Sequence, residues 1–266
     1  MRLQGKTAII VGAGQSPGSG MGNGRATALR FAQEGAKVMA VDRELALAEE
    51  TAALVRKEGA DCFAFEADVT KEAAMAAMIA EAKKRWGRID VLHYNVGVSI
   101  AGGDAPPTEI TEAAFDRVVA INLRGVVMAC KHVLPVMRAQ KSGVILMISS
   151  LAAVERYPYV AYKATKAAMV AYTQQLAIQN AEYGIRANSI LPGLMDTPMA
   201  VDTRARHSGK PRAEVAAMRD ARVPLRRKMG TAWDVANAAL FLASEEANFI
   251  TGVDLLVDGG GALNTG

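Results

Sequence analysis

Short runs of consecutive apolar residues alternate along the chain with longer, alanine-rich segments of mixed polarity. Each short run has the length of a buried strand, and most of them end at a glycine or a polar residue. The longer segments are rich in helix formers, and glycine follows several of them. The predicted strands are residues 7–11, 37–41, 62–66, 89–94, 144–148, 185–191 and 254–257, and the predicted helices are residues 25–34, 44–58, 72–86, 112–140, 160–181 and 232–243.

Strands and helices alternate from one end of the chain to the other. The strands are uninterrupted apolar runs, which is typical of parallel strands that are buried on both faces. The pattern therefore predicts an α/β Rossmann-type fold, a doubly wound parallel sheet with helices on both faces. No linker, low-complexity stretch or internal repeat interrupts the pattern, so we expect one domain over residues 1–266.

The composition argues against several classes of protein. Hydrophobic residues make up 51% of the chain, enough for a sizeable core. No apolar run approaches the roughly 18 residues that span a bilayer, and no signal-peptide core follows Met1. Cys62 and Cys130 lie far apart, and neither they nor the three histidines have metal-ligand spacing. We expect a cytoplasmic protein with reduced cysteines, no metal and no membrane segment.

Positive charge is concentrated in one segment. Between Asp202 and Lys228 there are nine Lys/Arg and three acidic residues, a net charge of +6, while the rest of the chain carries −2. The segment contains no aromatic residue, and the other helices carry charges of both signs, so we expect no nucleic-acid partner. A solvated helix pair, an oligomer contact and a site for an anionic substrate each explain the charge.

A glycine-rich loop, residues 12–24, joins the first strand to the first helix. Glycines let a pyrophosphate approach the backbone, and a helix N-terminus favours negative charge. Asp42 ends the next strand 18 residues after Gly24, where a carboxylate would bind ribose hydroxyls and repel a 2′-phosphate. We therefore expect a dinucleotide site that prefers NAD to NADP. Arg43, directly after Asp42, keeps NADP open.

Tyr162 and Lys166 lie four residues apart in a segment predicted to be helical, so their side chains should project from one face. A phenol titrates near pH ~10 and is a poor base at neutral pH. An ammonium one turn away favours the phenolate and lowers its pKa, which suits a tyrosine that moves protons. The spacing alone is common, and its meaning depends on the rest of the chain.

Taken together, these features resemble the short-chain dehydrogenase/reductase family, and the resemblance covers essentially the whole chain. The family's glycine pattern, Gly-x3-Gly-x-Gly, matches literally at Gly18, Gly22 and Gly24. Counted from the end of the strand, the first glycine is instead Gly12, with residues 15–20 as an insertion. We favour the alignment on Gly12, Gly22 and Gly24.

The resemblance implies a full set of site residues. Cofactor contacts are expected at Gly12, Gly22, Asn23, Gly24, Asp42, Arg43, Asp68, Val69, Asn95, Gly97, Tyr162, Lys166, Pro192, Gly193 and Thr197, and catalytic residues at Asn122, Ser150, Tyr162 and Lys166. It also implies the strand order 3-2-1-4-5-6-7, a substrate lid at about residues 194–228, and a homotetramer or homodimer paired through the helices after the fourth and fifth strands.

The catalytic serine has two candidates at the end of the fifth strand. In the family it usually precedes the tyrosine by 13 residues, which fits Ser149, whereas Ser150 precedes Tyr162 by 12. The family's strand end typically reads Ser-Ser with the second residue catalytic, and a one-residue deletion before Ala161 explains the shorter spacing. We favour Ser150 over Ser149.

The resemblance implies hydride transfer between a nicotinamide and an alcohol or carbonyl compound. Tyr162 would act as general acid and base, Lys166 would lower its pKa and bind the nicotinamide ribose, and Ser150 would orient the substrate oxygen. Asn122 would hold a water that relays protons. Arg204 and Arg206 are candidates for contacts with an anionic substrate.

Alternatives remain at this stage. Within the family, a cis-dihydrodiol or hydroxysteroid dehydrogenase fits as well as a simple secondary-alcohol dehydrogenase. Enoyl reduction is disfavoured, because that branch typically spaces its tyrosine and lysine more widely. Outside the enzymes, a catalytically silent nucleotide-sensing protein would keep the fold, but it has no need of all four catalytic residues.

Overall fold

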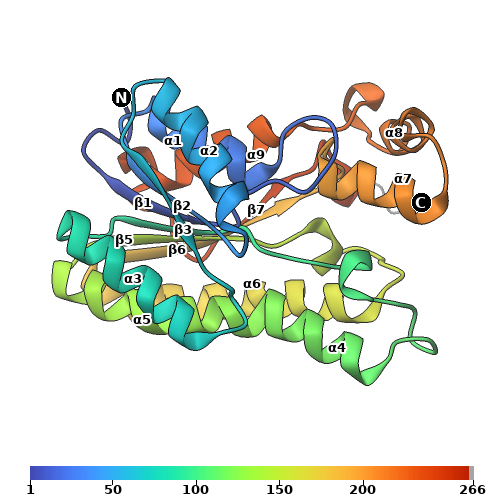
Figure 1. Ribbon diagram of the computed structural model, residues 1–266. Helices are drawn as coiled ribbons and strands as arrows, with labels where there is room; N and C mark the ends of the chain where they lie inside the picture. The colour runs from blue at the N-terminus through green and yellow to red at the C-terminus, as the bar shows by residue number, and fades with distance from the viewer. Residues whose placement is uncertain (264–266) are drawn as a thin grey trace.

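The structure, a computed structural model, describes residues 1–263, and all its strands lie in one sheet. The seven strands are parallel in the order β3-β2-β1-β4-β5-β6-β7, which confirms the expected fold class and strand order. The strands are β1 (Thr7–Val11), β2 (Lys37–Asp42), β3 (Cys62–Glu66), β4 (Val91–Tyr94), β5 (Gly143–Ile148), β6 (Ile185–Pro192) and β7 (Asp254–Val257) (Figure 1). The α-helices are α1 (Asn23–Gln33), α2 (Leu45–Lys57), α3 (Glu72–Trp86), α4 (Glu112–Val119), α5 (Gly125–Gln140), α6 (Val160–Asn180), α7 (Thr203–Ser208), α8 (Arg212–Asp220) and α9 (Ala232–Ala243).

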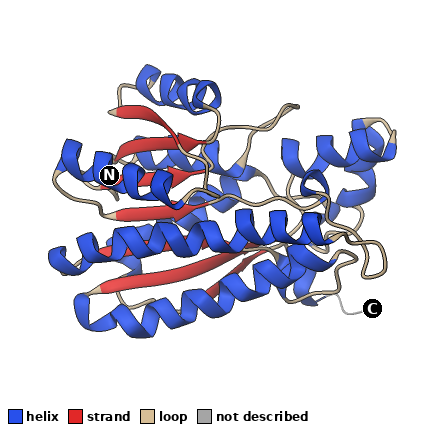
Figure 2. Ribbon diagram, turned by 60° about the horizontal axis from the view of Figure 1, so that its bottom comes forward, coloured by secondary structure: helices blue, strands red, loops and turns tan. Residues whose placement is uncertain are grey.

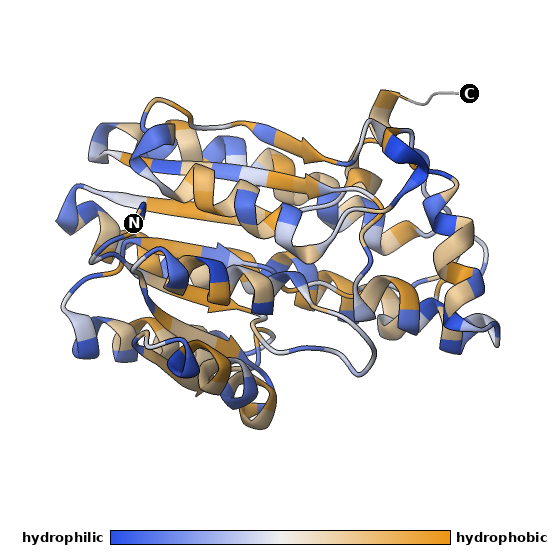
Figure 3. Ribbon diagram, turned by 90° about the horizontal axis from the view of Figure 1, so that it is seen from above, coloured by the Kyte–Doolittle hydropathy of each residue, from blue (hydrophilic) through white to orange (hydrophobic). Residues whose placement is uncertain are grey.

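Helices cover both faces of the sheet, as Figures 1 and 2 show. On one face α1, α2 and α9 enclose a core that includes Ile10 and Phe31, and on the other α3, α5 and α6 enclose a core that includes Ile9 and Met169. Successive strand residues point to opposite faces, so the neighbours Ile9 and Ile10 enter different cores. The uninterrupted apolar runs follow from this arrangement, and Figure 3 shows the strands largely in the hydrophobic colour.

The long helix expected at residues 112–140 contains a π-helical turn. Thr111 begins α4, where its Oγ1 accepts a hydrogen bond from the amide of Ala114 (3.2 Å). The turn Ala120–Arg124 then links α4 to α5 without a break in direction of the backbone, since all its flanking residues keep helical dihedral angles. Such turns are rare and are frequent at functional sites. Helix propensity could not have located it, because every residue in it tolerates an ordinary helix.

The helical run 112–140 is long and apolar enough, by length and composition alone, to cross a membrane, with a hydropathy of 1.3 in its most apolar window. The expectation from sequence considered only uninterrupted apolar runs and did not identify it. Core helices of soluble proteins satisfy the same test. Here Val126, Val133 and Met137 of α5 are buried in the core beside the sheet, so packing explains part of the hydropathy, and 39% of the window is buried.

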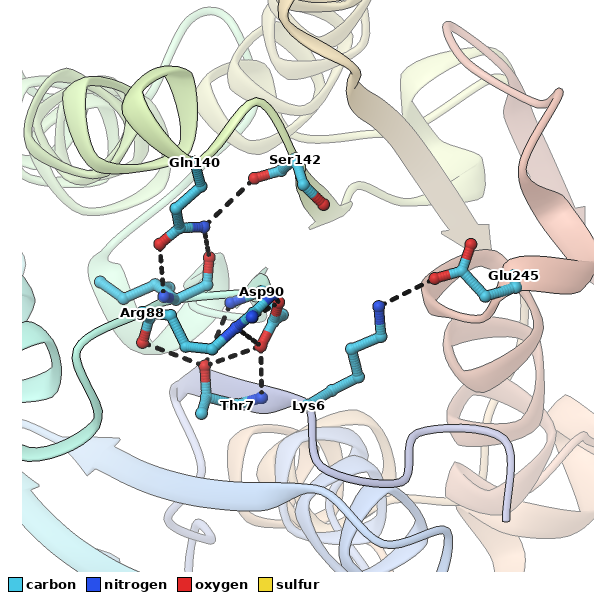
Figure 4. A network of polar contacts seen from close by, with 8 residues as sticks. Lys6, Thr7, Arg88, Asp90, Gln140, Ser142 and Glu245 are labelled. Carbon is cyan, nitrogen blue, oxygen red and sulfur yellow. Dashed lines mark hydrogen bonds and ion pairs between the residues drawn. The ribbon is translucent and has the colours of Figure 1, made fainter.

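A polar network ties the sheet together at the amino ends of β1 and β4 (Figure 4). Asp90 Oδ2 accepts hydrogen bonds from the amide (2.9 Å) and the hydroxyl (3.1 Å) of Thr7, and Arg88 pairs with the same carboxylate (2.5 Å). Gln140, at the end of α5, bonds both the amide (2.9 Å) and the carbonyl (2.8 Å) of Ile89. This end of the sheet is therefore filled with satisfied polar groups, and the opposite end is left for a site.

Replacing Asp90 with alanine should lower the free energy of unfolding by about 3 kcal/mol, because the Thr7 amide and hydroxyl lose their buried partner. The measurement is urea denaturation followed by circular dichroism. Glu245→Ala is the matched control, since its ion pair with Lys6 (2.8 Å) is at the surface and 76% of the Glu245 side chain is exposed. We expect it to change stability by about 0.5 kcal/mol or less. Equal losses in the two variants would contradict this account of the network.

Candidate active site

A cleft of about 790 Å³ opens at the carboxyl ends of the strands. The strand order runs from β1 to β3 toward one edge of the sheet, and the chain then returns to place β4 on the other side of β1. Ligands of open α/β sheets bind at the point between β1 and β4 where the strand order reverses. All of the expected cofactor contacts face the cleft, as do Ser150, Tyr162 and Lys166. The expected site residues, apart from Asn122, are thus brought together by the segments that follow β1 to β6 and by the start of α6.

The loop between β1 and α1 is packed so closely that two of its glycines are required. A Cβ on Gly24 would lie 2.0 Å from the carbonyl oxygen of Gly12, and Gly12 itself has a φ of +81°. Gly12 therefore meets Gly24, which supports the alignment counted from the end of the strand. The N-terminus of α1 has no side-chain cap and no acidic residue in its first turn. Its free N–H groups fit a pyrophosphate.

The end of β2 presents one carboxylate to the cleft. Asp42 accepts hydrogen bonds from the amides of Gly14 (3.1 Å) and Glu44 (3.3 Å). Burial raises the pKa of Asp42 above its ordinary value, and these hydrogen bonds oppose the rise. Arg43 also borders the cleft, but its guanidinium pairs with Glu44 (3.2 Å) and 72% of its side chain is exposed. A ribose hydroxyl pair suits this carboxylate, so the cleft residues fit a nicotinamide dinucleotide.

The inserted residues 15–20 form a bridge from the glycine loop to the segment after β6. Gln15 holds the loop in shape, since its side chain accepts from the Gly22 amide (3.0 Å) and donates to the Gly20 carbonyl (3.1 Å). At the far side, the Ser19 amide donates to Asp202 Oδ1 (3.1 Å). From the sequence, the inserted residues were expected to bulge near the pyrophosphate or the adenosine. The contact with Asp202 was not expected, because Ser19 and Asp202 lie 183 positions apart along the chain.

The two serines that end β5 have different surroundings. Ser149 is buried, and its Oγ donates to the carbonyl oxygen of Lys166 (2.8 Å). The hydroxyl of Ser150 accepts from the Ala152 amide (3.1 Å), faces the cleft with Tyr162 and lowers the pKa of the Tyr162 phenol. The structure thus places Ser150 beside the phenol and uses Ser149 to fix the backbone of α6.

Lys166 is held deep in the site. Its Nζ donates to the carbonyl oxygen of Ile148 (2.7 Å), and a Cβ on Gly97 would lie 2.9 Å from the same nitrogen. Only 2% of the residue is exposed. Burial lowers the pKa of Lys166 to about 7. The amine therefore changes charge near neutral pH.

Tyr162 is affected by burial in the opposite direction. Burial raises the pKa of its phenol to about 12, while the neighbouring Ser150 hydroxyl and the charge of Arg204 lower it. From the sequence, only Lys166 was expected to lower this pKa. In the structure Lys166 Nζ lies 5.7 Å from the centre of the Tyr162 ring and is bonded to Ile148, and Ser150 and Arg204 are further groups that lower the pKa of the phenol.

Asn122 occupies the π-helical turn and is fully buried. Its Oδ1 accepts from the Val98 amide (2.8 Å), and its Nδ2 donates to the Val98 carbonyl (2.9 Å) and to Thr165 Oγ1 (3.1 Å). The side chain thus fixes the loop after β4 to α6 behind the cleft wall. One lone pair of Oδ1 remains for the water relay expected from the family.

Asp104 is a site residue that the sequence analysis missed. Its two carboxylate oxygens accept from the amides of Ala161 (2.9 Å) and Tyr162 (2.8 Å), at the start of α6. The carboxylate therefore caps the helix that carries Tyr162 and Lys166. A cap supplied from 58 residues away leaves no local pattern in the sequence.

Helices α7 and α8 cover one end of the cleft, within the segment expected to form a lid. They pack on a small core of their own, made of Val201, Val215, Val223 and Met229. Arg204 and Arg219 face the cleft. Arg206 does not, because its guanidinium donates to the carbonyl of Pro17 (3.1 Å) at the surface. The structure thus brings Arg204, and not Arg206, to the site.

Comparisons with known proteins agree with this site. A family model described as enoyl-(acyl carrier protein) reductase matches residues 18–262. A solved structure from Burkholderia xenovorans, described as a short-chain dehydrogenase/reductase, is 42% identical with a TM-score of 0.92, over 100% of this chain and 99% of that chain.

Two relatives of known name also match along nearly their whole length. The 2-(R)-hydroxypropyl-CoM dehydrogenase of Xanthobacter autotrophicus is 36% identical over 96% of this chain and 97% of its own. The levodione reductase of Leifsonia aquatica is 35% identical over 91% of each chain. The chain therefore belongs to the short-chain dehydrogenase/reductase family, and it is an oxidoreductase that acts on CH–OH groups with a nicotinamide cofactor.

Proposed function

We propose that this protein is an NAD(H)-dependent oxidoreductase that interconverts a secondary alcohol and its carbonyl compound. The observation that carries the proposal is that Ser150, Tyr162 and Lys166 line the same cleft, with the Lys166 amine 5.7 Å from the centre of the Tyr162 ring. Such a group can move a proton at the oxygen of a substrate while the carbon exchanges a hydride.

The proton chemistry belongs to this chain's own residues. The phenolic oxygen of Tyr162 takes the proton of the substrate hydroxyl during oxidation and returns it during reduction. Ser150 donates a hydrogen bond to the substrate oxygen and stabilises the charge that develops there. A bound nicotinamide supplies the hydride acceptor or donor. Since proton transfer is reversible, the same groups serve both directions.

Lys166 influences the phenol through its own charge. With a pKa lowered to about 7 by burial, Lys166 is charged below that pH and neutral above it. The charged form favours a phenolate at Tyr162, because opposite charges close together stabilise each other. Ser150 and Arg204 already lower the Tyr162 pKa against the effect of burial. Three groups thus act together to make the phenol a usable base.

Asp42 supports NAD over NADP. Its carboxylate faces the cleft at the end of β2, where it would bind two ribose hydroxyls and repel a phosphate. Arg43, which would favour NADP, is mostly exposed and pairs with Glu44. The ribose and pyrophosphate of NAD would lie at Asp42 and at the start of α1.

The spacing of Tyr162 and Lys166 supports alcohol chemistry rather than enoyl reduction. The two residues lie four apart within α6, as in the dehydrogenases that the chain resembles. The two named relatives are a dehydrogenase and a reductase, in keeping with a reversible reaction. A nucleotide sensor would not need the arrangement of Ser150, Tyr162 and Lys166 at one wall.

We further propose that the protein is a homodimer or homotetramer in the cytoplasm. The outer surfaces of α4 and α6 carry exposed apolar side chains, Phe115 (40% exposed) and Ile178 (74% exposed). Pairing of these helices between copies would cover the apolar face of the run 112–140. Sedimentation analysis of the purified protein measures the state directly.

The proposed function is tested by reduction of NAD with a panel of secondary alcohols, followed by nicotinamide absorbance. Tyr162→Phe should lower kcat by at least about 100-fold, because the proton acceptor is lost. Ser150→Ala should lower it by roughly 100-fold. Ser149→Ala is the matched control and should keep kcat while losing about 1 kcal/mol of stability. Full turnover by Ser150→Ala would reverse the assignment, and NAD binding without turnover on any alcohol would indicate a sensor.

Cofactor preference provides a separate test of Asp42. Asp42→Ala should lower the ratio of kcat/KM for NAD to kcat/KM for NADP by at least about tenfold, since removal of the carboxylate relieves repulsion of the 2′-phosphate. Glu49→Ala is the control, because its side chain pairs with Arg56 at the surface of α2 and does not line the cleft. If the wild type already prefers NADP, the proposal for NAD is wrong.

Asp104 should act as a positioning residue for Tyr162. In Asp104→Asn one of the two helix amides loses its acceptor, the start of α6 shifts, and kcat should fall roughly tenfold to 100-fold with the Kd of NAD unchanged. Thr231→Ala is the control, because it removes the capping box of α9 and should cost about 1 kcal/mol of stability without a change in kcat. A loss of stability alone in Asp104→Asn would reduce Asp104 to an ordinary helix cap.

A further inference from the structure

Arg219 is a buried cation that forms no ion pair with any residue of the described part of the chain, residues 1–263. It lies on α8, only 8% of the residue is exposed, and it faces the cleft together with Arg204 of α7. Its Nε has no hydrogen-bond partner among the described residues. A buried, unpaired guanidinium is costly, because water that solvated it in the unfolded chain has been removed. A fold can retain this cost in the absence of ligand if a bound ligand supplies the missing partner.

The neighbouring acids are committed elsewhere. The segment 194–228 contains four carboxylates, and each of them pairs with a basic residue of the same segment. Arg212 binds Asp196 (2.5 Å) and Asp202 (3.2 Å), Lys210 binds Glu214 (2.5 Å), and Lys228 binds Asp220 (2.5 Å). Within residues 1–263, Arg204 and Arg219 form no ion pair with any of them. Arg204 and Arg219, which line the cleft, therefore carry positive charge that no carboxylate of the segment neutralises by an ion pair.

Two carboxylates near this end of the cleft act on the arginines from a distance. Glu155 faces the cleft but forms no ion pair with Arg204 or Arg219 among residues 1–263, and the charge of Asp196, which pairs with Arg212, also acts on Arg219. Burial, with repulsion from Arg204 and Arg222, lowers the pKa of Arg219 to about 10. Arg219 therefore remains charged at neutral pH, and three guanidiniums repel one another in a partly dry space.

The two arginines lie close to the reacting end of the substrate site. Tyr157 is stacked obliquely beside Tyr162, with ring centres 5.4 Å apart, and its hydroxyl bonds Ser99 Oγ (3.2 Å). The charges of both Arg204 and Arg219 act on Tyr157, and that of Arg204 also acts on Tyr162. An anion held by the arginines would thus lie in the same cleft as Tyr162, at the end where Tyr157 also lines it.

We propose that Arg219, together with Arg204, binds an anionic group of the substrate, so that the natural substrates are small alcohols or ketones carrying a carboxylate, sulfonate or phosphate a few bonds from the reacting carbon. This inference rests on the proposed function, since it assigns the remote part of the same substrate. The planar guanidinium fork of each arginine suits two oxygens of such a group. Binding would supply the counter-charge that the fold lacks.

The test is calorimetric titration of the NAD-loaded enzyme with butanoate, butane-1-sulfonate and the neutral butanamide, at low ionic strength. Binding needs no turnover, so its outcome is separate from that of the alcohol panel. We expect the wild type to bind at least one anion roughly tenfold or more tighter than butanamide, and Arg219→Gln to remove that difference. Arg206→Gln, at the surface beside Pro17, is the matched control and should leave it unchanged.

Arg204→Gln provides a second variant on a different helix, should Arg219→Gln fail to fold. It is expected to weaken anion binding in the same direction, and Arg219→Lys should restore part of the affinity because it returns the charge without the fork. Equal affinity of the wild type for anions and butanamide would overturn the proposal. Loss of NAD affinity in Arg204→Gln or Arg219→Gln, with anion binding retained, would also overturn it, since the arginines would then serve the cofactor.

Discussion

The burial of the Lys166 side chain is the constraint on which the site depends. Its nitrogen lies between the carbonyl end of β5 and the loop after β4, and only a glycine at position 97 leaves room for it. Ser149 fixes the backbone of Lys166 to the same strand, so β5 and α6 are joined twice within one turn. Ser150 and Tyr162 are brought together because these two elements cannot slide past each other.

Burial perturbs the two titrating groups in opposite senses. It raises the pKa of the Tyr162 phenol to about 12 and lowers that of the Lys166 amine to about 7, because in both cases it disfavours the charged form. The charged phenolate thus requires neighbouring donors and cations. Ser150, Arg204 and a protonated Lys166 meet this requirement together. The four-residue spacing of Tyr162 and Lys166 would not meet it alone.

The fold could be predicted from the sequence because its elements are encoded locally. Buried runs such as residues 7–11 must be strands covered on both sides, and the family resemblance orders them. The catalytic and cofactor residues follow at strand ends, where the topology collects them. The missing parts depend on contacts between distant segments. Asp104 caps α6, Asn122 lies in a π-helical turn, and the inserted loop donates a hydrogen bond from the Ser19 amide to Asp202. The number and sign of the charges in the segment do not show which arginines face the cleft. For this reason Arg206 was expected at the cleft and Arg219 was not.

The contact between the inserted loop and Asp202 has a consequence for the order of events in turnover. Asp202 receives the Ser19 amide on one oxygen and the Arg212 guanidinium on the other. The loop beside the cofactor site and the helices over the substrate site are therefore fastened to one side chain. A displacement of either segment would therefore have to break its hydrogen bond to Asp202 or carry the other segment with it, so the borders of the two sites are mechanically coupled.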